Sequence, residues 1–275
     1  MQNRIDRHCA GWDGLCKRQL VTMAARMTTA ADIAELAGIA ALAGGLATAG
    51  YFVEGLRPTS QLFGRCLVAP PNPEEIALTF DDGPNPRWTP QLLDLLAKYN
   101  VRASFFLIGQ FAVTQRELVR RIHEAGHLIG NHTWSHPNLF RTDRRETRKE
   151  LDETTSRLQQ ITGTRVRFFR PPFGARRPHT LLIARELGLI PVTWNVIGND
   201  WDARSAEAIV RRVTRLTDKN HRRGNATNLV LHDGGHRTLE ADRSRTVAAT
   251  GELLARYTPS RRFVTLDAWK AYGHA

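Results

Sequence analysis

Two aspartates and two histidines suggest the first chemistry in this sequence. Asp81 and Asp82 are adjacent, and His132 and His136 lie four residues apart. Two imidazoles and one carboxylate give three ligands for a divalent cation and leave an open position for water, as in catalytic zinc sites. Such a cation polarises a carbonyl group and lowers the pKa of its water. The second aspartate would then be free to move protons.

The local structure expected around these four residues separates their roles. Neighbouring side chains on a strand point to opposite faces, so Asp81 and Asp82 should not share one task, although a turn at Gly83-Pro84 could bring both to one pocket. We expect His132 and His136 to lie on one face of a helical turn. Each pattern alone also has an ordinary structural interpretation, because Asp-Gly-Pro is common turn chemistry and many HxxxH pairs are unrelated surface histidines.

Further along the chain, three groups could complete such a site. Arg170 could keep a carboxylate ionised and oriented, and the Pro171–Gly174 turn could offer a backbone N–H to an oxyanion. His232 could act as a general acid near neutral pH, and Trp201, beside Asp200, could stack on a sugar face. The structural alternatives are a surface salt bridge for the arginine, a satisfied structural histidine and a core tryptophan.

Short apolar segments alternate with amphipathic helices from Glu74 onward. The expected strands cover residues 76–80, 103–108, 127–131, 166–169, 190–196, 229–231 and 263–266. Helices are expected between them, with Thr89 and Thr142 as N-caps of two. Repeated alternation of this kind implies parallel strands with helical crossovers. It allows an open doubly wound sheet or a closed barrel, although no GxGxxG motif follows the first strand.

Polar clusters follow five of the expected strands. In a parallel barrel the carboxyl ends of the strands share one face, where catalytic groups converge. A glycosidase would need two carboxyl groups across a sugar, such as Asp81 with Asp200 or Asp233, but that chemistry has no use for the HxxxH pair. A hydrolytic metal site uses more of the clusters, which cover residues 81–84, 131–136, 170–174, 199–201 and 232–235.

The composition is that of a globular protein with a basic surface. The chain has 275 residues, 41% of them hydrophobic, and a formal net charge of +12. This length suits one large α/β domain, or a domain of roughly 200 residues with an extension. The positive charge is compatible with an anionic partner or with a solvated basic surface. Three sparse cysteines without a CxxC pair predict neither a disulfide framework nor a cysteine zinc site.

The N-terminal region is interpreted separately. Residues 36–53 carry no charge until Glu54 and have about the minimum length of a membrane-spanning helix. We expect a membrane anchor or an uncleaved signal helix there, with a buried helix as the alternative. Prolines at 70, 71 and 73 favour extended chain, so we place a domain boundary at Pro73. The expected parts are an extension at 1–73, a domain at 74–268 and a tail at 269–275.

Five motifs together resemble the NodB-homology polysaccharide deacetylases, carbohydrate esterase family 4. They are Thr79–Pro84 (TFDDGP), His132–His136 (HTWSH), Arg170–Gly174 (RPPFG), Trp194–Trp201 (WNVIGNDW) and Leu229–Asp233 (LVLHD). The resemblance covers about residues 74–268 and implies a distorted (β/α) barrel with about seven parallel strands. The fourth motif departs from the family at Asn195 and Gly198, where the family often carries acids.

The resemblance also implies a metal site and a base. Asp82, His132 and His136 would bind a divalent cation, with zinc as the usual ion and cobalt or nickel as alternatives. Asp81 would be the catalytic base, and Arg170 would position it.

The remaining motifs imply an acid and substrate contacts. His232 would protonate the leaving amine, and Asp200 would tune it. The backbone N–H of Phe173 would help to stabilise the oxyanion, and Phe173, Gly174 and Trp201 would contact the substrate.

The implied function is hydrolysis of N-acetyl groups on a polysaccharide or oligosaccharide that contains N-acetylglucosamine, such as peptidoglycan or chitin. Alternatives are an acetylxylan esterase or deformylase on the same scaffold, or a basic polysaccharide-binding module without activity. We expect a location in the cell envelope, with membrane attachment through residues 36–53 as one form of it, no nucleic-acid partner, and a monomer as the default state.

Overall fold

The computed structural model describes residues 41–42, 44–45 and 48–274. The chain divides into two units, Met1–Val53 and Glu54–Ala275. The described residues of the first unit are helical. Part of the segment 36–53, including all of 36–40, lies outside the described residues. No helix among those that are described is long and apolar enough to cross a membrane.

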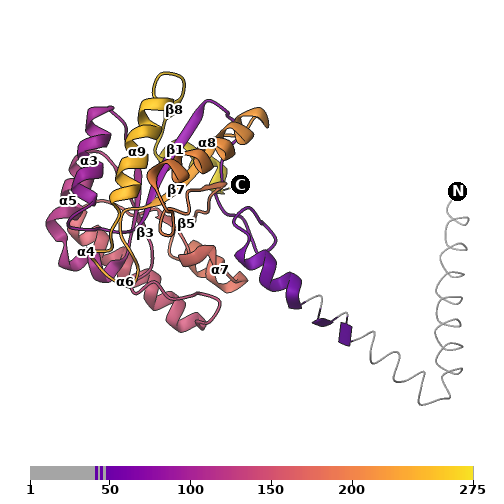
Figure 1. Ribbon diagram of the computed structural model, residues 1–275. Helices are drawn as coiled ribbons and strands as arrows, with labels where there is room; N and C mark the ends of the chain where they lie inside the picture. The colour runs from indigo at the N-terminus through magenta and orange to yellow at the C-terminus, as the bar shows by residue number, and fades with distance from the viewer. Residues whose placement is uncertain (1–40, 43, 46–47, 275) are drawn as a thin grey trace, which may run out of the picture. The chain divides into compact units, whose positions relative to one another are not determined.

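A parallel sheet forms the centre of the second unit (Figure 1). Seven strands follow one path in the order β5-β4-β3-β2-β1-β7-β6, and β8 pairs with the start of β1. Every one of these pairings is parallel. The strands are β1 (Glu75–Gly83), β2 (Ser104–Leu107), β3 (Leu128–Asn131), β4 (Phe168–Phe169), β5 (Ile190–Pro191), β6 (Val196–Ile197), β7 (Thr227–His232) and β8 (Arg262–Phe263).

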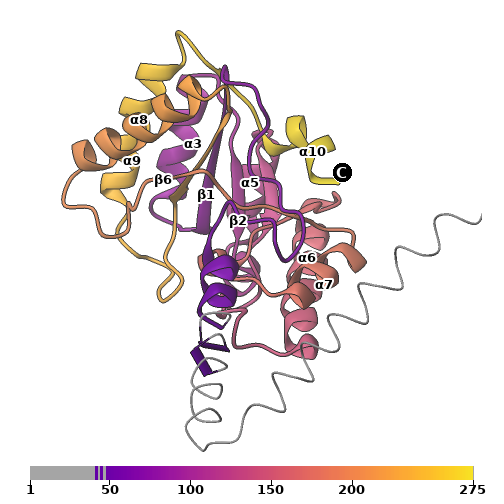
Figure 2. The same ribbon diagram turned by 90° about the vertical axis from the view of Figure 1, so that its right-hand side faces the viewer.

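Helices cover the outside of this sheet. Figure 2 shows α8 and α9 beside α3 on one side, with α5, α6 and α7 on the other. The helices are α3 (Thr89–Lys98), α4 (Gly109–Thr114), α5 (Arg116–Glu124), α6 (Arg144–Thr162), α7 (Pro178–Glu186), α8 (Ala206–Arg222), α9 (Ser244–Tyr257) and α10 (Ala271–His274), with 3₁₀ turns at Pro172–Gly174 and Leu266–Trp269. The sheet is therefore curled into a half-barrel, and the α/β barrel class implied by the motifs is confirmed.

The curl of the sheet explains one error in the expected strands. Residues 190–196 were expected to form one strand, but they form β5 at one end of the strand path and β6 at the other. The few residues between them cross the open side of the half-barrel. Val192 pairs with Leu67 on the way, and Asn195 donates its backbone N–H to Asn228. These long-range pairings replace the continuous strand that local sequence favoured.

The core lies between the central strands and the helices. All nine residues of β1 are buried, which is typical of a parallel strand covered on both faces. Phe80 of β1 stacks on Phe105 of β2 with ring centroids 5.1 Å apart. Complete burial of one such side chain contributes about 1.5–3 kcal/mol. This packing fixes the strand whose end carries the two aspartates.

Two threonines that were expected to cap helices have other partners. Helix α6 is capped by Asp143, whose carboxylate accepts the backbone N–H of Glu146 at 2.8 Å, and not by Thr142. Thr89 lies inside α3 as its first residue, and its hydroxyl donates to buried Asp233 at 2.5 Å. Thr89 therefore follows the N-cap position, which Trp88 occupies. The first helix after β2, α4, was not expected from the sequence.

Candidate active site

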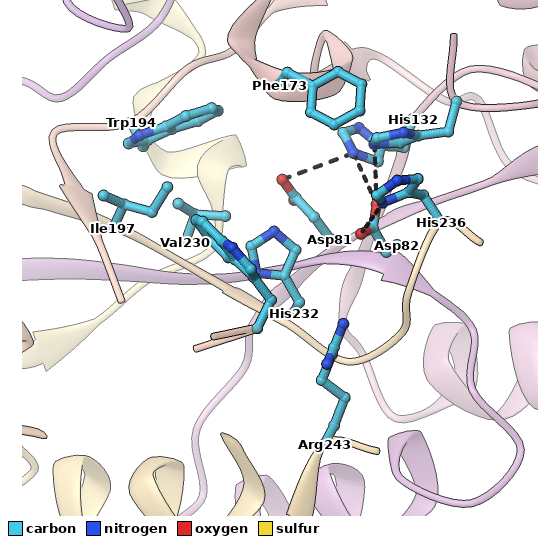
Figure 3. A pocket seen from close by; sticks show the side chains of 12 residues that line it. Asp81, Asp82, His132, Phe173, Trp194, Ile197, Val230, His232, His236 and Arg243 are labelled. Atoms are coloured by element: carbon cyan, nitrogen blue, oxygen red, sulfur yellow. Dashed lines mark ion pairs between the residues drawn. The ribbon is translucent and has the colours of Figure 1, made fainter. Parts of the chain in front are cut away.

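The polar clusters that end five strands meet around one pocket of about 340 Å³ (Figure 3). Its walls include both aspartates of β1, both histidines of the HxxxH pair and His232 at the end of β7. The structure therefore brings together the candidates from the first, second and fifth motifs. Arg170, from the third motif, lies fully buried behind the pocket.

Asp82, His132 and His136 form a cluster with the dimensions of a cation site. The Oδ1 atom of Asp82 lies 3.4 Å from Nε2 of His132 and 3.1 Å from Nε2 of His136. One potential ligand atom from each residue lies within 4.8 Å of the others, and all three side chains are buried. Tetrahedral zinc with bonds of 2.0–2.1 Å separates its ligand atoms by about 3.4 Å. The donor set and its spacing thus fit a zinc-sized ion.

The electrostatics of Asp82 favour its ionised form. Burial opposes ionisation, but the neighbouring imidazoles of His132, His136 and His236 outweigh it and hold the pKa of Asp82 well below its usual range. Burial lowers the pKa of His136, and Asp82 opposes that shift only in part. An ionised carboxylate at Asp82 beside a weakly basic imidazole at His136 is the combination of protonation states that metal binding requires.

A bulge in β1 explains how two adjacent carboxylates reach the same pocket. The register between β1 and β2 shifts between Asp81 and Gly83, and Asp82 has a left-handed backbone with φ of 71°. Such bulges re-aim a side chain, and they are common beside active sites. A left-handed non-glycine residue costs about 1–3 kcal/mol, so the surrounding contacts must hold it. A regular strand would have sent the two carboxylates to opposite faces.

The loop that carries the two histidines is not the helical turn that we expected. Thr133 and His136 have positive φ values of 67° and 59°, and residues 132–138 contain no helix. The side chain of Asn131 accepts the N–H of Thr133 at 2.7 Å, and Glu150 accepts the N–H of Trp134 at 2.8 Å. The imidazoles converge because side chains satisfy the loop backbone, and i, i+4 helical spacing has no part in it.

Arg170 holds the other aspartate of the pair. Its Nη1 donates to Oδ1 of Asp81 at 2.7 Å and to the hydroxyl of Thr79 at 2.6 Å. Burial lowers the pKa of Arg170, and the charge of Asp81 opposes that shift. Since the arginine is fully buried, this pair is not the surface salt bridge that the sequence also allowed. The second oxygen of Asp81 lies 3.9 Å from His132, next to the cation site.

His232 and Asp200 form a second buried pair across the pocket. Nδ1 of His232 lies 2.8 Å from Oδ1 of Asp200, and the backbone N–H of His232 donates to Oδ2 at 2.8 Å. Thr246 also donates its hydroxyl to that oxygen. Burial alone would lower the pKa of His232, but the carboxylate of Asp200, aided by Asp82 and Asp81, raises it to about 9. His232 is therefore a proton donor at neutral pH.

Known proteins resemble this chain in sequence and fold. The profile of the polysaccharide deacetylase family matches residues 69–192. A chitooligosaccharide deacetylase of Azorhizobium caulinodans is 35% identical over 174 residues, which cover 63% of this chain and 80% of that protein. The chain belongs to the polysaccharide deacetylase family.

Two further relatives of the family are peptidoglycan deacetylases. The peptidoglycan-N-acetylglucosamine deacetylase of Bacillus cereus is 42% identical over 151 residues, 55% of each chain. The crystal structure of the Bc1960 peptidoglycan N-acetylglucosamine deacetylase has a TM-score of 0.65 and 35% identity, and the match covers 74% of this chain and 91% of that one. The match thus spans about half of the Bacillus cereus relative, although it spans most of the solved domain.

The substrate-contact candidates of this family member differ in their surroundings. Phe173 and Trp201 line the pocket and are about half exposed, at 50% and 49%. The ring of Trp201 meets His232 edge-on at 5.0 Å. Gly174 is buried beside Trp194, where a Cβ atom would lie 3.0 Å from the indole. Gly174 therefore supports the pocket wall and does not line the pocket.

Sequence analysis missed several residues of the site. Trp194 forms part of the pocket wall, and Asn228 accepts a donor of Arg170 at 3.3 Å from behind. His236 and Arg243 reach the pocket from the loop after β7. The only sequence signal for His236 was its spacing of four residues from His232, which repeats the HxxxH spacing of the second motif.

Proposed function

We propose that this protein is a metal-dependent hydrolase that removes N-acetyl groups from a polysaccharide or oligosaccharide containing N-acetylglucosamine. One observation carries the proposal: Asp82, His132 and His136 place ligand atoms within 4.8 Å of one another, with Asp81 beside them. The names of its relatives, which include peptidoglycan and chitooligosaccharide deacetylases, support the same reaction class. We assign the catalytic domain to residues 74–268.

The roles follow from the two buried pairs. A divalent ion held by the cluster, zinc being the best fit to two imidazoles and a carboxylate, would polarise the acetamide carbonyl and lower the pKa of water. Asp81, which Arg170 holds in position by a hydrogen bond of 2.7 Å, takes the proton of the attacking water. His232, protonated at neutral pH, donates a proton to the leaving amine nitrogen. General acid and base steps of this kind each contribute about 10²–10⁴-fold.

The open side of the pocket is suited to a sugar. Trp201 offers an exposed aromatic face beside the acid, and Phe173 offers a second one beside the cation site. We assign the oxyanion contact to the backbone N–H of Phe173. Peptidoglycan or a chitin-like polymer is the proposed substrate, which places the enzyme in the cell envelope. A net charge of +12 favours an acidic envelope polymer over a neutral one.

Acetate release is the test of this function. The full chain would be assayed on chitin oligomers, peptidoglycan and acetylated xylan, with and without a chelator, and again after zinc is restored. We expect release from an N-acetylated substrate that the chelator abolishes and zinc restores. Release that continues unchanged after complete removal of metal would contradict the proposal.

The same assay separates the alternatives. Release from acetylated xylan alone would identify an ester hydrolase on this scaffold. No release from any substrate, together with tight binding to an acidic polymer, would identify a binding module. The second outcome would leave the buried Asp81–Arg170 and His232–Asp200 pairs without a chemical role.

A further inference from the structure

A third imidazole lies against the metal-binding cluster. His236, in the loop after β7, stacks on His136 with ring centroids 4.7 Å apart and planes inclined by 18°. Its Nδ1 atom lies 3.9 Å from Oδ2 of Asp82, and its ring meets Phe173 edge-on at 5.4 Å (Figure 3). His236 thus contacts two of the three candidate ligands, and none of the five motifs includes it.

The loop that carries His236 is fixed in place. Gly234 packs so closely on the backbone of Asp82 that a Cβ atom would lie 2.1 Å from the carbonyl oxygen. Arg243 donates its Nε–H to the carbonyl of Gly234 at 2.7 Å. Both contacts are made by Gly234, two residues before His236, so the start of this loop is fixed against the cluster and the position of the imidazole does not depend on a flexible side chain alone.

The three candidate ligands differ in how they are oriented. The Nδ1 atom of His132 is anchored on the carbonyl oxygen of Arg170 at 2.8 Å. The Nδ1 atom of His136 is buried and has no hydrogen-bond partner in the described part of the chain. Asp82 directs Oδ1 to the two imidazoles, so that Oδ2 is the atom that faces His236.

This difference matters because metal ligands are oriented by neighbouring groups that contact them but do not bind the metal. A ligating imidazole or carboxylate is usually held by a second group, and loss of that group lowers metal affinity about 10–100-fold. The last torsion of an aspartate is soft, so a carboxylate held at one oxygen can rotate. His136 and Asp82 lack an anchor of the kind that His132 has, and both contact His236.

We propose that His236 is a positioning residue of the metal site. Its ring holds His136 by stacking, and its Nδ1 faces Oδ2 of Asp82 at 3.9 Å, where it attracts the carboxylate and limits its rotation, so that both ligands keep the orientation that a cation requires. His236 acts through them and not as a ligand, because only Asp82, His132 and His136 form the close cluster among the residues with described positions. The inference rests on the proposed metal-dependent function.

Zinc affinity of the full-length protein tests this role without recourse to activity. Metal-free wild type, His236→Ala, His236→Phe and His236→Asn would be titrated with zinc in competition with a chromophoric chelator. Phe keeps the stacking ring and loses the nitrogen, whereas Asn keeps a donor and loses the ring. We expect His236→Ala to bind zinc about tenfold or more weakly, with the other two variants in between.

Two controls separate positioning from a general structural effect. Arg237 is exposed beside His236, so Arg237→Ala should leave zinc affinity unchanged. The metal-free Phe and Asn variants should unfold with a midpoint within about 2 °C of wild type. If His236→Ala does not fold, the Phe and Asn variants decide the matter, since weaker affinity in either supports the role.

Wild-type affinity in His236→Ala, or in both the Phe and Asn variants, would overturn the inference. A wild-type protein that takes up no zinc would instead refute the metal-dependent function itself. The two failures are therefore distinguishable in one set of titrations.

Discussion

Replacement of Asp200 by Asn should move the alkaline limit of activity to lower pH. The substitution preserves the size of the side chain but removes the negative charge that lies 2.8 Å from Nδ1 of His232. In the wild type, burial disfavours the imidazolium, and Asp200 is the largest influence that raises the pKa, to about 9. Without that charge, burial acts with less opposition, so the pKa should fall to about 6.5 or below.

The sign follows from the role of His232 as an acid. An acid must be protonated, so activity is full below its pKa and declines as pH rises through it. At pH 8, a group with a pKa of about 9 is roughly 90% protonated, and one with a pKa of 6.5 is roughly 3% protonated. The variant should therefore lose about thirtyfold or more in kcat/KM at pH 8. A cation bound beside Asp82 would offset the contributions of Asp81 and Asp82 to the pKa of His232. The difference in pKa between wild type and variant therefore depends on Asp200.

The assay is kcat/KM for acetate release over roughly pH 6 to 10, measured at saturating zinc. Thr246→Val is the matched control, because it removes a hydrogen bond to Asp200 of 2.8 Å and leaves the charge. In the control, the alkaline limb of the pH profile should shift by less than about half a pH unit. An alkaline limb that coincides in Asp200→Asn and wild type would refute the assignment of His232 as the acid, or of Asp200 as the group that controls it.

Three other predictions concern the same site. Asp81→Asn should keep its zinc affinity within about threefold of wild type but lose about 10²–10⁴-fold in turnover. His132→Ala should lose more than about a hundredfold in zinc affinity. Equilibrium titration with zinc and an acetate-release assay distinguish the two variants. Arg170→Met leaves a buried carboxylate without its partner and should cost about 3–5 kcal/mol, measured by denaturant unfolding. Gly234→Ala should lower the thermal midpoint by at least about 3 °C through its 2.1 Å overlap with backbone, while Gly251→Ala, whose Cβ meets nothing closer than 3.7 Å, should not.

The regular elements could be predicted from sequence because their signals are local. Strand β1 follows from an apolar run that ends at two aspartates, and α6 ends at Gly163, whose left-handed conformation is common for glycine at the end of a helix. The split between β5 and β6 has no local signal. It depends on the partners of Leu67 and Asn228, which lie far away along the chain. Curling of a sheet is a property of such pairings and is not encoded in the period of any one strand.

The ligands of the candidate site could be predicted from sequence, but the conformation of the loop that carries them could not. Sequence analysis selected Asp82, His132 and His136, and the structure places them together. It gave the wrong reason for the convergence of the histidines, because the loop is held by Asn131 and by Glu150, which comes from α6. A spacing of four residues is therefore weak evidence for a helix when side chains from other elements can satisfy the backbone.

Residues that orient the ligands were the hardest to find, for a physical reason. A metal ligand must be His, Cys or a carboxylate, which limits its residue type and makes a motif visible. A group that orients a ligand needs only a donor, an acceptor or a flat ring in the right place, so a main-chain carbonyl serves His132 and an imidazole serves His136. The backbone strain at Asp82 shows that such groups matter, since a bulged, left-handed residue persists only where tertiary contacts hold it. Those contacts, with the glycine that lets the loop of His236 approach, connect β1 to β7 and become visible only when the chain is folded.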